Sequence, residues 1–146
     1  LAHARRENAA LVFTGFRRMS ADGARVGHYI GVPRTLSYRQ LLGHTAIATS
    51  TVLIDRARAG DVRMESVYYD DFVCWLSILR QGHVAHGLDE DLMRYRVMKG
   101  SVSRNKGASA RAVWRIYRAT LGLDRVVAAW HFARYAFHAI LKYRRF

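Results

Sequence analysis

Cysteine is nearly absent from the sequence, since Cys74 is the only one among 146 residues. A single cysteine excludes a disulfide within the chain. Its neighbours Phe72, Trp75 and Leu76 are large and apolar. This setting predicts a buried thiol in a reducing compartment rather than a catalytic nucleophile.

Long apolar runs are absent as well. No run of apolar residues approaches the roughly 20 that a membrane-spanning helix needs. The most apolar region is interrupted by four polar side chains, which are His131, Arg134, His138 and Lys142. The sequence therefore does not predict a spanning helix.

Acidic residues are scarce. The chain has 11 Asp and Glu against 24 Lys and Arg, which gives a formal net charge of +13. A surface of that sign attracts phosphates, nucleic acid or anionic lipid, without indicating which. Hydrophobic residues make up 51% of the chain, and its length suffices for one domain with a real core.

Several catalytic motifs are also missing. The sequence has no Gly-x-Ser-x-Gly nucleophile elbow, and its polar loop over 99–107 lacks the spacing of a P-loop. His83 and His86 lie three residues apart at the start of a predicted strand. On a strand they would point to opposite faces, which disfavours a shared zinc ion.

Mixed strands and helices are predicted first, and helices alone follow. The predicted strands cover 9–16, 25–32, 48–54, 84–87 and 92–97, the first two forming a hairpin around Asp22 and Gly23. The predicted helices cover 1–8, 38–42 after the cap Ser37, 70–82, 108–121 and 123–143. This order predicts an α/β portion over 1–107 and a C-terminal helical appendage over 108–146.

The acidic pair Asp70 and Asp71 opens the predicted helix 70–82. Acidic residues in a first helical turn are common caps, and the helix N-terminus favours their ionised form. A fixed carboxylate can also accept a proton from a substrate hydroxyl or help to hold a divalent cation. Spacing alone leaves both interpretations open.

Cations and small residues mark the polar loop that follows Arg96. The loop carries Lys99, Ser103 and Lys106 beside glycines, so it can offer hydroxyls, backbone N–H groups and charge to a phosphate. A solvated surface turn fits equally well. The planar guanidinium of Arg96 can clamp a diphosphate, or it can be an exposed arginine on an edge strand.

The last predicted helix separates an apolar stripe from a basic face. The stripe contains Leu123, Val127, Trp130, Phe137 and Leu141, and the basic face contains His131, Arg134, His138, Lys142 and Arg145. We expect the stripe to pack on the domain and the basic face to meet an anionic membrane surface. The alternative is an ordinary docked helix with a solvated basic face.

The order of these segments resembles the C-terminal half of family 2 glycosyltransferases, with the closest likeness to bacterial surface-polysaccharide enzymes of the teichuronic-acid type. The resemblance covers nearly the whole chain and lies in order and spacing. It is carried by Phe13-Thr14-Gly15-Phe16, Asp22-Gly23, Val32-Pro33, Thr49 through Asp55, Asp70-Asp71-Phe72 with Trp75-Leu76 and Gly82, Leu92 through Arg96, and Ser101 through Lys106.

The resemblance implies the acceptor-side half of a GT-A fold and an inverting sugar transfer from a nucleotide diphosphate sugar. Asp71 would be the general base, beside Asp70 where the family usually has Glu. Arg96, Ser103 and Lys106 would lie near the donor diphosphate, and Thr49, Ser50 and Trp75 would border the acceptor site. The acceptor would be a lipid-linked glycan or polysaccharide at the cytoplasmic face of the membrane.

One departure concerns the metal ion. The family holds Mg or Mn through an Asp-x-Asp in its N-terminal half. The acidic run Asp89-Glu90-Asp91 of this chain instead follows the predicted helix 70–82. The chain also begins at Leu1 rather than Met. These features suggest a part of a longer enzyme that does not turn over alone.

Two functions without catalysis compete with this prediction. One is a basic module that binds nucleic acid, but Lys and Arg are spread over every segment instead of one recognition helix. We therefore expect no nucleic-acid partner. The other is a membrane-surface adaptor in which only the terminal helices matter.

Overall fold

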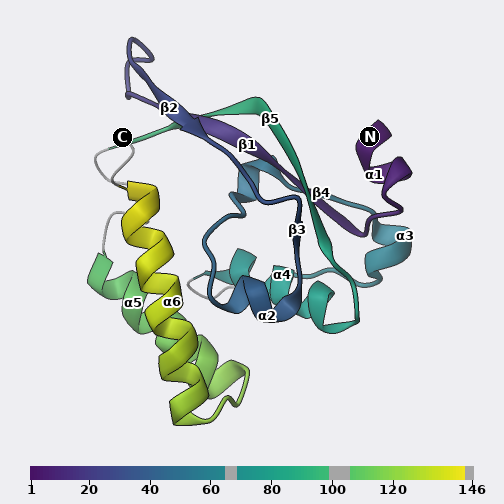
Figure 1. Cartoon of the computed structure of the whole chain (residues 1–146), viewed down its shortest axis with the longest axis vertical. Coiled ribbons are helices and arrows are strands. Elements are labelled where there is room, and N and C mark those ends of the chain that lie inside the picture. Colours follow the sequence, from purple (N-terminus) through teal and green to yellow (C-terminus); the bar gives the residue numbers. More distant parts are fainter. Residues whose placement is uncertain (65–68, 99–105, 144–146) are drawn as a thin grey trace.

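A mixed β-sheet organises the chain (Figure 1). The computed structural model describes residues 1–64, 69–98 and 106–143. Within them the strands are β1 Leu11–Met19, β2 Val26–Ile30, β3 Thr35–Leu36, β4 Leu53–Ile54 and β5 Ala85–Arg96. Four strands follow the order β2-β1-β5-β3. The short strand β4 pairs with the beginning of β1, at Leu11 and Val12.

Strand β1 is the centre of the sheet. It pairs antiparallel with β2 and β4 and parallel with β5, while β3 pairs antiparallel with β5. Its side chains Leu11, Phe13 and Phe16 are buried, as expected for a central strand. A parallel pair requires a long crossover connection, and this crossover carries the segment in which Thr49, Asp70 and Asp71 lie.

Helices lie against the sheet and beyond it (Figure 1). They are α1 Ala2–Arg6, α2 Tyr38–Leu42, the 3-10 turn η1 Thr49–Thr51, α3 Arg56–Ala59, α4 Asp70–Arg80, α5 Lys106–Arg115, the π-helical turn η3 Ile116–Thr120 and α6 Arg125–Tyr143. Helix α2 starts at a capping box, because the Ser37 hydroxyl accepts from Gln40 N and the Gln40 side chain accepts from Ser37 N.

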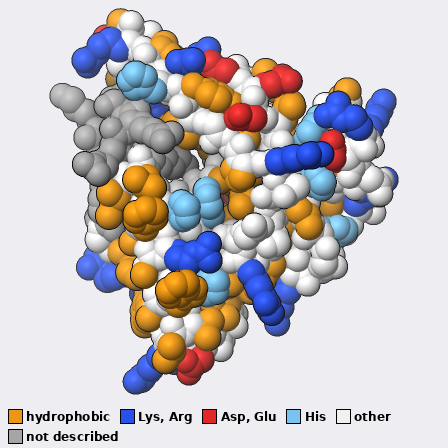
Figure 2. All heavy atoms as spheres, viewed as in Figure 1, with side chains coloured by type: hydrophobic (Ala, Val, Ile, Leu, Met, Phe, Trp, Pro, Cys, Tyr) orange, Lys and Arg blue, Asp and Glu red, His pale blue; other side chains and the backbone are white. Residues whose placement is uncertain are grey.

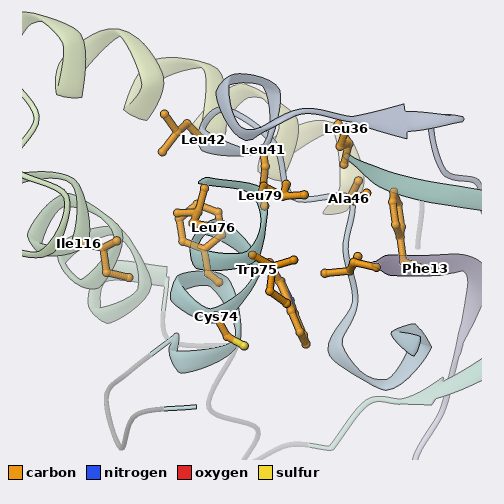
Figure 3. Packing of buried hydrophobic residues seen from close by; sticks show 14 of the residues in the cluster. Phe13, Leu36, Leu41, Leu42, Ala46, Cys74, Trp75, Leu76, Leu79 and Ile116 are labelled. Carbon is orange, nitrogen blue, oxygen red and sulfur yellow. The ribbon is translucent and has the colours of Figure 1, made fainter. Parts of the chain in front are cut away.

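Helix α4 supplies much of the hydrophobic core (Figure 3). The core members on α4 are Phe72, Cys74, Trp75, Leu76, Ile78 and Leu79. They pack with Leu41 and Leu42 from α2 and with Phe13 from β1. Residues of α5, η3 and α6 belong to the same buried cluster, where the Tyr117 hydroxyl donates to the Leu42 carbonyl.

Most predicted elements are confirmed. The hairpin of β1 and β2, the helix capped by Ser37, the helix that starts at Asp70, and two final helices separated at Gly122 all form. Gly122 has φ +64, a conformation that glycine adopts without strain. The α/β class with a C-terminal helical appendage is likewise confirmed, while the boundary at 107 stays a prediction.

Two predicted strand boundaries are wrong. The expected strand 48–54 contains the turn η1, and only Leu53–Ile54 forms a strand. The turn forms because the Thr51 hydroxyl and backbone N–H both donate to the Ala48 carbonyl. The expected strands 84–87 and 92–97 form one strand, β5. Its polar middle stays in the sheet because Asp89 accepts from the Tyr29 hydroxyl at 2.7 Å and Asp91 accepts from Arg17 Nε at 2.7 Å.

The predicted orientation of the last helix is also wrong. Trp130 and Phe137, expected to pack on the domain, are 64% and 60% exposed. Helix α6 instead turns Ala128, Phe132 and Tyr135 inward. The small side chain of Ala128 lets α6 approach its neighbours closely on this inward face. Lys142 and Arg145 lie outside the described side chains.

None of the helices in the described ranges combines the length and the apolar character needed to cross a membrane.

Removal of the Tyr117 hydroxyl should destabilise the fold. The substitution Tyr117→Phe leaves the Leu42 carbonyl without this donor in a buried setting, so we expect the free energy of unfolding to fall by about 1 to 2 kcal/mol. Urea unfolding measures the change. Tyr95→Phe, on a half-buried ring that contacts Phe16, is the control, and equal losses in both variants would contradict the assignment.

Candidate active site

Two carboxylates are fixed at the N-terminus of α4. The helix begins after Tyr69, which has φ +67 and makes no side-chain capping bond. Asp70 Oδ1 accepts from Asp71 N at 2.8 Å, and Asp71 Oδ1 accepts from Phe72 N at 2.7 Å. Both side chains therefore satisfy N–H groups of the first turn, as the capping interpretation expects.

Asp71 has a second contact that capping does not explain. The hydroxyl of Thr49, on the turn η1, donates to Asp71 Oδ2. Asp71 is half-buried, whereas Thr49 and the adjacent Ser50 are exposed. The structure thus brings together the residue predicted as general base and one predicted to border the acceptor site, at a place that solvent reaches.

No cation neutralises this pair among the described residues. Neither Asp70 nor Asp71 has a Lys, Arg or His nitrogen within 4.0 Å there. The helix N-terminus supplies the stabilising positive field instead. An ionised carboxylate in this arrangement keeps lone pairs that can accept a hydrogen bond, and then a proton, from a hydroxyl.

The site rests directly on the core. Phe72, which follows Asp71, contacts Tyr117 and Tyr135, with ring centroids 6.4 and 6.2 Å apart. Trp75, one turn further along α4, is only 3% exposed, and its buried indole Nε1 has no hydrogen-bond partner among the described residues. The structure therefore places Trp75 in the core beneath the carboxylates, not on the surface with Thr49.

Cys74 is buried, as predicted. Burial raises the pKa of its thiol, and the carboxylates of Asp70 and Asp71 raise it further. A raised pKa lowers the thiolate fraction at neutral pH.

Of the residues predicted to bind the donor diphosphate, only Arg96 has a described side chain. Arg96 Nη1 donates to the Ala21 carbonyl at 2.7 Å, at the tip of the β1–β2 hairpin, and none of its described contacts reaches Thr49 or Asp71. Ser103 lies outside the described residues. Lys106 starts α5, and its side chain also lies outside the description.

The acidic run on β5 is used for structure. A hydrogen bond from Tyr29 holds the pKa of Asp89 below its usual value, and one from Arg17 does the same for Asp91. In ranges 1–64, 69–98 and 106–143, no group of three or more His, Cys, Asp or Glu could hold a metal ion. The described residues therefore offer no ligand set for Mg or Mn, and the ion that the resemblance implies, held mainly by the family's N-terminal half, stays a prediction.

One group of polar residues could not be found from the sequence. Tyr38 and Arg39 of α2 face His131 and Arg134 of α6 across a cavity of about 500 Å³. The two helices are separated by 82 residues, and no periodicity in either segment indicates that they meet.

Comparison with known proteins places these features in context. The chain is 36% identical over 136 residues to the putative teichuronic acid biosynthesis glycosyltransferase TuaG of Bacillus subtilis (strain 168), a match that covers 92% of the chain and 54% of TuaG. The chain thus spans about half the length of this relative. The resemblance to bacterial surface-polysaccharide glycosyltransferases is confirmed.

Two Escherichia coli proteins are also similar, and both are named UDP-Glc:alpha-D-GlcNAc-diphosphoundecaprenol beta-1,3-glucosyltransferase. WfaP is 35% identical over 74 residues, which are 51% of the chain and 30% of WfaP. WfgD is 28% identical over 92 residues, which are 62% of the chain and 36% of WfgD. No family model and no solved structure matches the chain.

The environment of Cys74 predicts slow thiol chemistry. Because the thiol is buried and its pKa is raised, we expect its reaction with Ellman's reagent at pH 8 to be at least about tenfold slower in the folded protein than in 6 M urea. The unfolded chain is the internal control. Equal rates in the two states would contradict the packing of α4.

Proposed function

The chain is homologous to glycosyltransferases of bacterial surface-polysaccharide synthesis, and from this premise we propose that it is the acceptor-side part of an inverting glycosyltransferase. It serves the transfer of a sugar from a nucleotide diphosphate sugar to a lipid-linked or polysaccharide acceptor. The observation that carries the proposal is the contact between Thr49 and Asp71, because it holds a carboxylate at an accessible position where no cation neutralises it within the described residues.

In this mechanism Asp71 is the general base. Its carboxylate takes the proton of the acceptor hydroxyl as the hydroxyl oxygen attacks the anomeric carbon. The bond from that carbon to the diphosphate breaks on the opposite face, the electron pair leaves with the nucleoside diphosphate, and the configuration inverts. The proton thus ends on Asp71 and the negative charge on the leaving group.

Thr49 and Asp70 position the base. The hydroxyl of Thr49 orients Asp71 Oδ2, and the carboxylate of Asp70 holds the backbone N–H of Asp71. Ser50 lies exposed on the same turn as Thr49, where it can contact the acceptor sugar. A base held in one orientation needs less rearrangement before proton transfer.

The departing diphosphate requires cations. We assign this role to Arg96, Ser103 and Lys106. Arg96 donates one N–H to the hairpin at Ala21, and a guanidinium has four further donors for a phosphate. A divalent ion would supply charge stabilisation, but the described residues offer it no ligand set.

We place the reaction at the cytoplasmic face of the membrane.

Substitution of the base tests the proposal. In the protein expressed from its complete gene, Asp71→Asn should lower kcat by about 10² to 10⁴, while the KM for the donor changes less than about twofold because Asp71 faces the acceptor. Sugar transfer is measured with radiolabelled donor. Asp61→Asn, at an exposed ion pair with Arg63, is the control, and a retained kcat in Asp71→Asn would refute the role of Asp71.

The role of Thr49 has its own test. Thr49→Val removes the hydroxyl with little change in shape, so we expect kcat to fall about tenfold to a hundredfold, the worth of one hydrogen bond to a charged group. Thr49→Ser keeps the hydroxyl and should retain most of the rate. The pH profile of kcat should move in Thr49→Val only. Similar rates for the two variants would contradict the positioning role.

A further inference from the structure

Helix α6 exposes an apolar stripe to solvent. The α6 stripe consists of Val126, Trp130, Phe137, Ile140 and Leu141, which are 77%, 64%, 60%, 60% and 42% exposed. Their spacings of three, four and seven residues place them on one face of the helix. Figure 2 shows hydrophobic side chains gathered there beside Lys and Arg.

The opposite face of α6 is already occupied. Ala128 is fully buried, and Phe132 and Tyr135 pack against the core. Phe132 also meets Trp114 of α5, with ring centroids 5.8 Å apart. The α6 stripe is therefore not the side by which the helix attaches to the rest of the described chain.

Basic residues outnumber acidic ones in the segment that contains the stripe. Residues 106–143 contain seven Lys and Arg and a single acidic residue, Asp124. Asp124 accepts from Val126 N at 2.8 Å and so caps α6. Arg134 is exposed and lies on the helix between Trp130 and Phe137, one turn from each.

A basic cavity adjoins the stripe. Trp130 of the stripe lines the cavity of about 500 Å³ between α2 and α6, together with Arg39, His131 and Arg134. Arg39 and Arg134 are exposed, so their guanidinium groups are accessible to a ligand. The cavity thus offers guanidinium donors next to an apolar surface.

We propose that α6 docks on an anionic phospholipid bilayer. The α6 stripe enters the boundary between headgroups and acyl chains, while Arg39 and Arg134 bind lipid phosphates at the cavity. This goes beyond the proposed function, because binding requires neither donor nor acceptor. A second copy of the chain is disfavoured as the occupant, since two surfaces of the same high positive charge repel each other.

Binding to vesicles tests the proposal. The intact chain should co-sediment with vesicles of equal phosphatidylglycerol and phosphatidylcholine at least tenfold more strongly than with pure phosphatidylcholine. The double variant Phe137→Ser/Ile140→Ser should lose at least tenfold in binding to the anionic vesicles. Val26→Ser/Leu92→Ser, which removes apolar side chains 52% and 61% exposed on the sheet, is the matched control and should bind as the parent does. Circular dichroism confirms that the variants fold.

A charge pair on the same helix tests the phosphate contact. Arg134→Gln should weaken binding to anionic vesicles severalfold, whereas Arg125→Gln makes the same charge change on the opposite side of α6 and should weaken it less. Three outcomes would overturn the proposal: equal binding to neutral and anionic vesicles, loss of binding in 5 mM inorganic phosphate at constant ionic strength, or a dimer in sedimentation that Phe137→Ser/Ile140→Ser dissociates.

Discussion

The packing of α4 is the constraint on which the rest of the structure depends. Its apolar side chains fill the space between the sheet and the C-terminal helices. Both the sheet and these helices therefore bury apolar side chains against α4. The ring of Phe72 contacts Tyr117 and Tyr135, and this packing limits the movement of the preceding residue, Asp71. The position of Asp71 therefore depends on core packing as well as on its contact with Thr49.

The parallel pairing of β1 and β5 has a second consequence. It requires a long connection between β1 and Ala85, and this connection contains both η1 and the start of α4. A turn and a helix terminus that are 22 residues apart can then meet, as Thr49 and Asp71 do. The sheet topology thereby creates a site that no single segment carries.

The sequence predicted those elements whose signals are local. The spacing of Phe72, Trp75 and Leu79 indicates α4, and the cap Ser37 indicates the start of α2, because both signals depend on neighbours within a turn. The role of Asp71 as general base was predicted from the family resemblance. The position of Asp70 and Asp71 at the start of a helix was predicted from the spacing of the apolar residues that follow them.

Other features depend on partners that are distant in the sequence. Asp89 and Asp91 look like a strand break until Tyr29 and Arg17 are placed beside them. The orientation of α6 could not be predicted for a similar reason: both of its faces contain apolar residues, and the choice between them depends on which fits α2 and η3. Small Ala128 fits, and Trp130 does not.

The helix that carries Asp71 contacts α6, the helix that carries the α6 stripe, through the rings of Phe72 and Tyr135. Tyr135 lies on the inward face of α6 and touches Phe72, the neighbour of Asp71, while the stripe lies on the outward face. If α6 rests on a bilayer, the carboxylate is held above it at a height of about one helix diameter, on the order of 10 Å. In the proposed mechanism, the acceptor hydroxyl must therefore reach Asp71 at about that height above the bilayer.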